Sequence, residues 1–217
     1  MASRIVVGIS GASGAVYARR IIQLLLDKNI QVHLVVSPMG QRLLHDELGI
    51  EALNLESLTG RSPLPRIMAE ATDMAGASGG LVEAGEPAIV MHSYRDLGAA
   101  IASGSFLHQG MVIVPCSSNS LAAVATGNQQ NLMHRAAHVT LKERRRLVLV
   151  HRELPLSLID IENMQKATQA GAIICPASPG FYMLPKTIDD LVDFVACRVL
   201  DLLQIHHNLP TRWPPNS

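Results

Sequence analysis

The feature that most restricts the fold of this chain is a repeated alternation between short apolar runs and longer amphipathic stretches. Five runs have the length and β-branched composition of strands buried in a parallel sheet: residues 4–9, 31–36, 111–115, 147–150 and 172–175. Helices are predicted at residues 15–28, 38–48, 120–125, 131–142, 159–170 and 188–203. Such units join parallel strands by right-handed crossovers, so we predict an α/β protein with one doubly wound parallel sheet in three layers.

The chain has 217 residues, a length that suggests one domain or at most two. Residues 60–88 are small, polar and interrupted by Gly and Pro, which favours a surface insertion in a single domain over a linker between domains. We therefore predict one domain over residues 1–205. Residues 206–217 are polar and Pro-rich, and we expect a C-terminal tail there.

The composition excludes several classes of function. The 18 basic and 18 acidic side chains cancel, and aromatic residues are only 3%, so we expect no nucleic-acid partner. No apolar run approaches the ~20 residues that cross a bilayer, so we expect no membrane contact. Three dispersed cysteines are typical of reduced thiols in a cytoplasmic protein.

The loop after the first strand is rich in glycine and opens a helix. Its Gly8, Gly11 and Gly14 follow a GxxGxxG spacing, which does not meet the GxGxxG dinucleotide fingerprint. The second strand ends at Ser37, without the acidic residue that would bind an adenosine ribose. Helix N-termini and glycine loops bind anions, so the pattern favours a mononucleotide over NAD. A tight turn without a ligand is the alternative.

Two later strand ends also carry polar residues. Residues 117–120 (Ser-Ser-Asn-Ser) suit a phosphate or the edge of a flavin ring, although a helix cap would explain them equally well. Arg152 and Glu153 follow the next strand directly, where an arginine can bind phosphate and a shielded carboxyl can carry a proton. A structural ion pair between these two is the alternative.

Two other features are weaker. His134 and His138 have the i, i+4 spacing of a metal pair, but no third ligand lies nearby in the sequence, so we predict no metal. Cys116 follows a strand as a nucleophile could, but no His–Asp partner is apparent. A small buried residue is the better interpretation.

Seven segments, in order, resemble the UbiX-type flavin prenyltransferases, and together they cover most of the chain. They are residues 5–14, 101–106, 110–117, 134–137, 141–145, 152–155 and 180–182. The resemblance implies a flavodoxin-like or Rossmann-like fold that binds reduced FMN as a substrate. It implies transfer of a dimethylallyl group from dimethylallyl phosphate to N5 and C6 of the flavin, without a metal. It further implies a homododecamer whose product, prenylated FMN, passes to a UbiD-type decarboxylase.

The resemblance also assigns roles to individual positions. The residues that would contact FMN are Gly11, Ala12, Ser13, Ser37, Ser117, Ser118, Asn119, Ser120 and Arg152. Those that would hold dimethylallyl phosphate are Tyr182, Arg198, Lys142 and Arg135. Glu153 would shuttle protons, with Ser13 and Glu47 at the same site. The pair Arg212-Trp213 would fold over the prenyl group.

One departure from the family pattern keeps an alternative open. The family usually has Cys-Ser-x-Lys-Thr where this chain has Cys-Ser-Ser-Asn-Ser, so Asn119 replaces a lysine. The altered block also resembles flavin-dependent cysteine decarboxylases, for which His92 is the plausible base. A non-catalytic FMN-binding protein is a third hypothesis.

Overall fold

The computed structural model describes residues 3–60 and 88–209. Its centre is a single sheet of parallel strands in the order β3-β2-β1-β4-β5-β6. The strands are β1 (Arg4–Ile9), β2 (Gln31–Val36), β3 (Ile89–His92), β4 (Gly110–Cys116), β5 (Arg146–His151) and β6 (Ile173–Ile174). The predicted doubly wound α/β sheet is confirmed, and its strand order is that of Rossmann-type folds.

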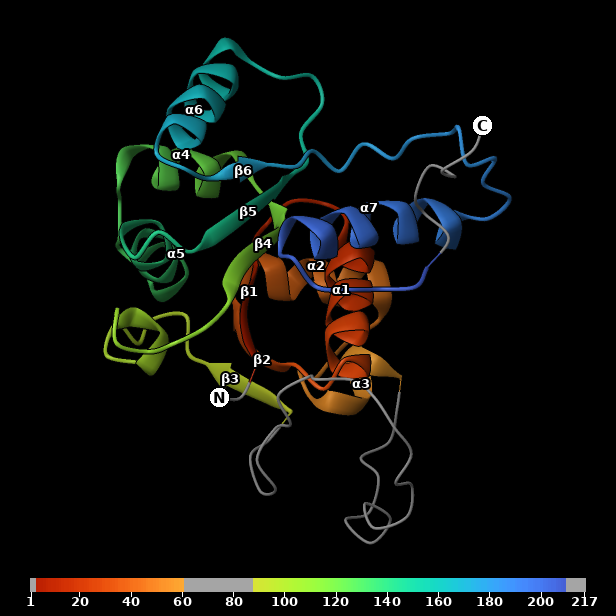
Figure 1. The fold of residues 1–217 in the computed structure, drawn as a ribbon, viewed down its shortest axis with the longest axis horizontal. Helices are drawn as coiled ribbons and strands as arrows, with labels where there is room; N and C mark the ends of the chain where they lie inside the picture. The colour runs from red at the N-terminus through yellow and green to blue at the C-terminus, as the bar shows by residue number, and fades with distance from the viewer. Residues whose placement is uncertain (1–2, 61–87, 210–217) are drawn as a thin grey trace, which may run out of the picture.

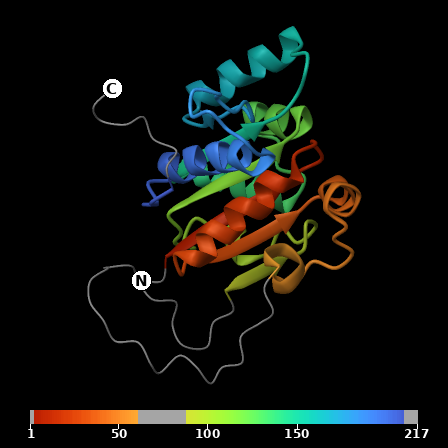
Figure 2. The ribbon, with the colours of Figure 1, turned by 90° about the vertical axis from the view of Figure 1, so that its right-hand side faces the viewer.

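Helices cover both faces of the sheet (Figure 1). One face carries α1 (Ala15–Asp27), α2 (Pro38–Leu48), α3 (Leu55–Thr59) and α7 (Ile188–Leu202). The other carries the short 3-10 helix η2 (Ala100–Ala102), α4 (Ser118–Thr126), α5 (Leu132–Lys142) and α6 (Leu158–Gln169). Helices α1 and α7 pack side by side over the strands (Figure 2). The three predicted layers are therefore present.

Alternation along the strands divides the apolar residues between two cores. In β1, Ile5 and Val7 pack with α1 and α7, whereas Val6 packs with α4 and α5. Successive side chains of a strand point to opposite faces, so a strand covered on both sides must be apolar throughout. This explains why the runs that predicted the strands contain almost no polar residues.

Most predicted boundaries agree with the structure to within one or two residues. Ser37 is the N-cap of α2 and Pro38 its first residue, as predicted. Helix α4 begins at Ser118, earlier than the predicted 120, because Ser117 is its N-cap. Strand β6 has only two residues, whereas a strand was predicted over residues 172–175.

Among the described residues, three elements were not predicted: α3, η2 and β3. Strand β3 has only four residues, and pairing with β2 at the sheet edge stabilises it. A strand this short shows no readable periodicity, so tertiary contacts decide its conformation. The predicted insertion at 60–88 and the tail at 206–217 lie largely outside the described residues, as do Arg212 and Trp213.

The switch point of the sheet lies between β1 and β4. From β1 the chain adds β2 and β3 toward one side of the sheet, and it then adds β4, β5 and β6 toward the other side. In open parallel sheets the loops on the two sides of this switch point separate, and a crevice forms at the carboxyl ends of the strands. The loops that follow β1, β2, β4 and β5 contain most of the predicted FMN-binding residues.

Candidate active site

The loops after β1 and β4 are joined through one buried hydroxyl. Ser10 Oγ donates a hydrogen bond to the carbonyl of Pro115 (2.8 Å) and accepts one from the backbone N–H of Ser117 (2.8 Å). Ser10 is only 2% exposed, so both bonds lie away from water. The two loops at the switch point are therefore held at a defined separation, which is what a bound ligand requires.

Two glycines shape the β1–α1 loop. A Cβ on Gly11 would lie 2.5 Å from Cβ of Met39 in α2, so only glycine allows the loop to pack this closely against that helix. Gly14 has φ 117°, in the left-handed region that glycine tolerates best. Between them, Ala12 is buried and Ser13 is half-buried at the entrance to α1.

The N-terminus of α1 receives a carboxylate from α2. Glu47 accepts hydrogen bonds from the backbone N–H groups of Gly14 (3.0 Å) and Ala15 (2.8 Å). No side chain of the loop itself caps this helix, so Glu47 satisfies first-turn donors that are otherwise unpaired. Glu47 therefore contacts Gly14, the residue that follows Ser13 in the chain.

The predicted serines also serve the fold. Ser37 Oγ accepts from the N–H of Gly40 (3.0 Å) and Ser117 Oγ from that of Ser120 (3.3 Å), so both are helix N-caps. The helix-cap alternative is thus correct for Ser117. A hydroxyl that accepts from a backbone N–H still has a proton to donate, so capping is compatible with ligand binding.

A polar network that the sequence did not reveal fixes the start of α4. Ser118 Oγ lies 3.3 Å from Nε2 of the buried His151 at the end of β5. Hydrogen bonds from Ser118 and Ser157 to the carboxylate of Asp160 hold the pKa of that group at about 2. Burial lowers the pKa of His151. The network connects the loop after β4 to β5 and α6.

Arg152 and Glu153 directly follow β5, at the carboxyl ends of the strands. The backbone N–H of Arg152 donates to the carbonyl of Cys116 (3.2 Å). Burial raises the pKa of the Tyr17 phenol in α1, and the positive charge of Arg152 partly opposes this effect. Arg152 therefore lies close to the first turns of α1. Glu153 is exposed, and among the described residues its carboxylate accepts only from the N–H of Leu154 (3.2 Å). Among the described residues, the alternative of an ion pair between Arg152 and Glu153 is not realised.

Tyr182 and Arg198 line one cavity of about 610 Å³. It lies between α7 and the segment that contains and follows β6, and Phe194 and Asp201 also line it. Arg198 Nη1 is 3.1 Å from a carboxylate oxygen of Asp201, and the Tyr182 ring packs edge-to-face on Phe194 (5.6 Å between centroids). Two residues predicted to hold the prenyl donor are therefore brought together.

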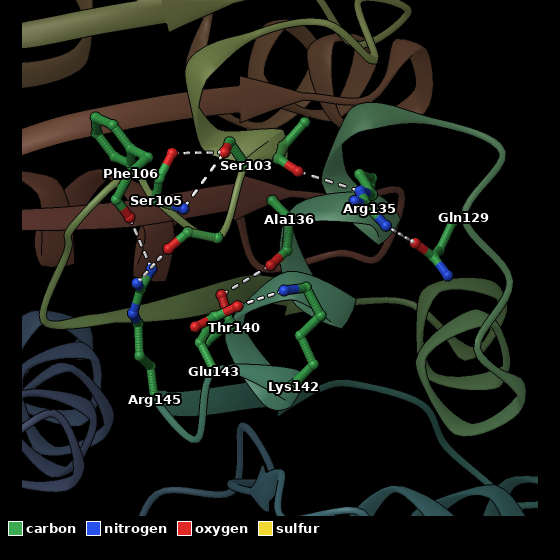
Figure 3. A network of polar contacts seen from close by, with 12 residues as sticks. Ser103, Ser105, Phe106, Gln129, Arg135, Ala136, Thr140, Lys142, Glu143 and Arg145 are labelled. Carbon is green, nitrogen blue, oxygen red and sulfur yellow. Dashed lines mark hydrogen bonds and ion pairs between the residues drawn. The ribbon is translucent and has the colours of Figure 1, made fainter.

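The structure places Lys142 and Arg135 elsewhere (Figure 3). Lys142 ends α5, pairs with Glu143, and lies against Gly104. Arg135 donates to the carbonyl of Ala102 (3.1 Å) and to Gln129 Oε1 (2.6 Å). Within one chain, Lys142 lies before the amino end of β5, whereas Arg152 follows its carboxyl end. Lys142 and Arg135 therefore do not line the cavity that contains Tyr182 and Arg198.

The remaining candidates have structural partners. His134 contacts Ser120 Oγ (3.3 Å) and Asn131 Nδ2 (2.9 Å). His92 Nε2 lies 2.9 Å from Nδ1 of His33. Cys116 is fully buried, as predicted, and burial raises the pKa of its thiol. Within residues 3–60 and 88–209, no group of three or more His, Cys, Asp or Glu side chains could hold a metal ion.

A Rossmann-type sheet with polar loops at its switch point is suited to bind a nucleotide, and the Flavoprotein family model, which matches residues 1–200, shows that the chain is an α/β flavoprotein. Within that class, the chain belongs to the UbiX family of flavin prenyltransferases. It is 43% identical over 207 residues to flavin prenyltransferase UbiX of Halalkalibacterium halodurans, covering 95% of this chain and 91% of the relative.

Two solved structures have the same fold. AnUbiX (PadA1) in complex with FMN and dimethylallyl pyrophosphate is 35% identical, with a TM-score of 0.79 over 100% of both chains. The dodecameric FMN-dependent UbiX-like decarboxylase of Escherichia coli O157:H7 is 34% identical, with a TM-score of 0.79 over 97% of this chain and 99% of that one. In the described part of the chain, no helix is long and apolar enough to span a membrane.

Proposed function

We propose that this chain is a flavin prenyltransferase that binds reduced FMN at the switch point of its sheet and transfers a dimethylallyl group to N5 and C6 of the flavin. The observation that carries the proposal is the tie between the loops after β1 and β4 through Ser10, with Arg152 at the same edge. The relatives named flavin prenyltransferase, and the related structure that contains FMN with dimethylallyl pyrophosphate, support it.

The flavin-binding residues we propose are those that the resemblance assigns. Gly11, Ala12 and Ser13 offer backbone and hydroxyl groups in a loop with no room for a larger residue at position 11. Ser37 and the segment 117–120 offer further hydroxyl and amide donors. Arg152 adds a positive charge that suits the electron-rich ring of reduced flavin or its phosphate.

Proton transfer is the role we propose for Glu153. Bond formation at N5 and C6 would release a proton from each atom. The departing phosphate would take up one proton, and the double bond of the dimethylallyl group would take up the other, which makes its tertiary carbon electrophilic toward C6. The Glu153 carboxylate, which within residues 3–60 and 88–209 is held only by the adjacent backbone N–H of Leu154, can turn between these positions. Ser13 lies beside Gly14 and Ala15, whose amides bind Glu47, so this second carboxylate can orient the loop and accept a proton nearby.

The cavity with Tyr182 and Arg198 is the proposed site of the donor phosphate. Breaking the allylic C–O bond leaves negative charge on the phosphate, and cations or phenolic donors there stabilise that charge. Asp201 already contacts Arg198, so the guanidinium is held in place before the donor binds. A non-catalytic flavin carrier would not need this second anion site.

Lys142 can complete the site only from another copy of the chain, and Arg135, which is engaged by Ala102 and Gln129, does not line the cavity of Tyr182 and Arg198 within its own chain. Strand β5 has six residues and is therefore ~20 Å long, which separates Lys142 from Arg152 in the same chain. We therefore propose a homo-oligomer, a dodecamer like the related Escherichia coli protein, in which α5 of one subunit faces the active site of another. Delivery of the product to a UbiD-type decarboxylase in the cytoplasm belongs to the same proposal.

The cysteine decarboxylase alternative has less support. It requires His92 as a base, but His92 is paired with His33, and burial lowers its pKa. Nothing in the described active-site loops points to that chemistry in preference to prenyl transfer.

The test is anaerobic incubation with reduced FMN and either dimethylallyl phosphate or the pyrophosphate, read by mass spectrometry of the flavin. We expect FMN gaining one five-carbon unit, with the preferred donor identified by the faster reaction. Unmodified FMN with both donors, under conditions in which the protein binds FMN, would contradict the proposal and favour a carrier. Loss of carbon dioxide from a peptidyl cysteine would favour the decarboxylase.

A further inference from the structure

A buried histidine that the proposed mechanism does not use lies just beyond the end of α7. His207 is only 3% exposed. Neither of its two ring nitrogens has a hydrogen-bond partner in the part of the chain that the structure describes. A buried polar group without such a partner lowers the stability of the fold, so its position calls for another explanation.

The turn after α7 brings His207 back against that helix. Gln204 has φ 60°, in the left-handed region, and the N–H of Ile205 donates to the carbonyl of Leu200 (2.9 Å), which is the pattern of a Schellman turn. Ile205 is buried in the core on the α7 face of the sheet, and Leu209 packs against the same core. His207 therefore lies between two anchored residues and is held in place.

Asp201, in the last turn of α7, lies between His207 and Arg198. Its Oδ1 is 3.2 Å from Nε2 of His207, and its Oδ2 is 3.1 Å from Nη1 of Arg198. The contact with His207 has the distance of an ion pair without the angles of a hydrogen bond. Because a carboxylate oxygen only accepts, we assign a hydrogen to Nε2.

The cavity of Tyr182 is lined by Asp201 and Arg198, whereas His207 is not among its lining residues. The imidazole therefore stands behind Asp201 as seen from the cavity. It can influence a molecule bound there only through the Asp201 carboxylate.

The way in which Asp201 holds Arg198 decides how much of the guanidinium is available to a ligand. An arginine and a carboxylate often pair through two parallel N–H···O bonds, which occupy one side of the guanidinium. Here one oxygen of Asp201 faces His207, and only the other accepts from Arg198. Within residues 3–60 and 88–209, this is the only hydrogen bond of the Arg198 guanidinium. Its other N–H groups can bind two oxygens of a phosphate.

We infer that His207 is a positioning residue for the donor phosphate. By attracting one oxygen of Asp201, it prevents that carboxylate from pairing with Arg198 through both oxygens, and the guanidinium stays available to the cavity. The inference rests on the proposed function and deepens it, because it adds a residue outside the cavity to the site that binds the donor.

The test uses variants that separate the imidazole N–H from its bulk. His207→Leu has a similar size but no donor, and His207→Gln keeps an N–H at about the same reach. Asp201→Asn and the double variant Asp201→Asn/His207→Leu show whether His207 acts through Asp201. His206→Leu is the matched control, since His206 is the exposed neighbour of His207.

Three quantities are measured for each full-length, oligomeric variant. The first is the pair of kcat and KM for dimethylallyl phosphate at saturating reduced FMN. The second is the dissociation constant of inorganic phosphate, measured by calorimetry on protein saturated with oxidised FMN, so that phosphate does not enter the flavin site. The third is the dissociation constant of FMN, which reports on the rest of the fold.

We expect His207→Leu to raise the donor KM and the phosphate dissociation constant by about 10-fold, within the range for one hydrogen bond to a charged group. The change in kcat should be smaller, because the phosphate is bound before and during the reaction, and FMN affinity should stay within about two-fold. His207→Gln should stay close to wild type. In the Asp201→Asn background, His207→Leu should have no further effect. His206→Leu should change none of these quantities.

Three results would overturn the inference while leaving the proposed function intact. The first is an unchanged donor KM and phosphate affinity in His207→Leu. The second is an equal loss of phosphate and FMN affinity, which would indicate damage to the fold. The third is a further loss caused by His207→Leu in the Asp201→Asn background. A wild-type protein that forms no prenylated flavin would overturn the proposed function, and the phosphate dissociation constants would still test the role of His207.

Discussion

Replacing Glu47 by glutamine tests the contact that holds the first turn of α1. The carboxylate accepts from the N–H groups of Gly14 (3.0 Å) and Ala15 (2.8 Å), both at the positive end of a helix of 13 residues. Glutamine has the same shape and retains one carbonyl oxygen, but it loses the negative charge and one acceptor. Both of these bonds go to Oε2, which the glutamine carbonyl oxygen can replace, so the substitution isolates the effect of the charge.

The expected loss follows from these contacts. A carboxylate at a helix N-terminus contributes about 0.3–1 kcal/mol, and a hydrogen bond to a charged group about 1.5–3 kcal/mol. The amide oxygen can keep both bonds without the charge, and water screens this exposed group, so we expect the free energy of unfolding to fall by about 1 kcal/mol. Urea unfolding at a fixed protomer concentration measures it, because oligomerisation otherwise alters the apparent stability.

Glu51→Gln is the matched control, since Glu51 is also exposed and lies in the loop just beyond α2. We expect its effect to stay within about 0.5 kcal/mol. The difference between the two variants should shrink in 1 M salt, which screens an exposed charge. If Glu47→Gln unfolds at the same urea concentration as Glu51→Gln, the carboxylate does not stabilise α1 and this account of the helix start is wrong.

Three further predictions concern residues near the carboxyl ends of the strands. Glu153→Gln should bind FMN within a few-fold of wild type but form the prenylated product about 10²–10⁴-fold more slowly, and wild-type single turnover would remove Glu153 from the mechanism. Because the folded-state pKa of Asp160 is about 2, below its ordinary 3.8, its stabilising effect should be present above pH 4 and lost as the pH falls toward 2. Asp160→Asn should thus lower the urea midpoint at pH 6 and match wild type near pH 2, and equal midpoints at pH 6 would refute this. Gly11→Ala should weaken FMN binding and cost about 1–3 kcal/mol of stability, because its Cβ would clash with Met39, and an unchanged melting temperature would show that the loop can move.

The local features of the site were readable from the sequence because they depend on neighbouring residues. Ser37 followed by Pro38 predicts a helix start, and the structure has one there. Gly11 and Gly14 predict a tight loop between a strand and a helix, which the packing against Met39 and the positive φ of Gly14 confirm. Each of these depends on residues that are close in the chain.

Contacts between distant parts of the chain were not predictable in the same way. Nothing near Ser118 in the sequence indicates that His151 and Asp160 will lie beside it. Likewise, Arg95 and Asn119 line one cavity, although Arg95 follows a short edge strand that has no recognisable pattern and is placed by the pairing of β3 with β2. The resemblance to a family assigns roles to residues in the loops but predicts none of these contacts.

The amino-acid sequence by itself determined the α/β class, the strands and helices with strong periodicity, and the polar residues at the ends of the strands. These follow from side-chain alternation, capping and turn chemistry, which act over a few residues. Only the tertiary structure decided that Glu47 binds the start of α1 and that Tyr182 and Arg198 share a cavity. It also decided that Lys142 lies near the amino ends of the strands, away from that cavity. The reason is that the order of strands in the sheet, and not proximity in the chain, sets which loops meet, and burial of both faces of the sheet selects that order.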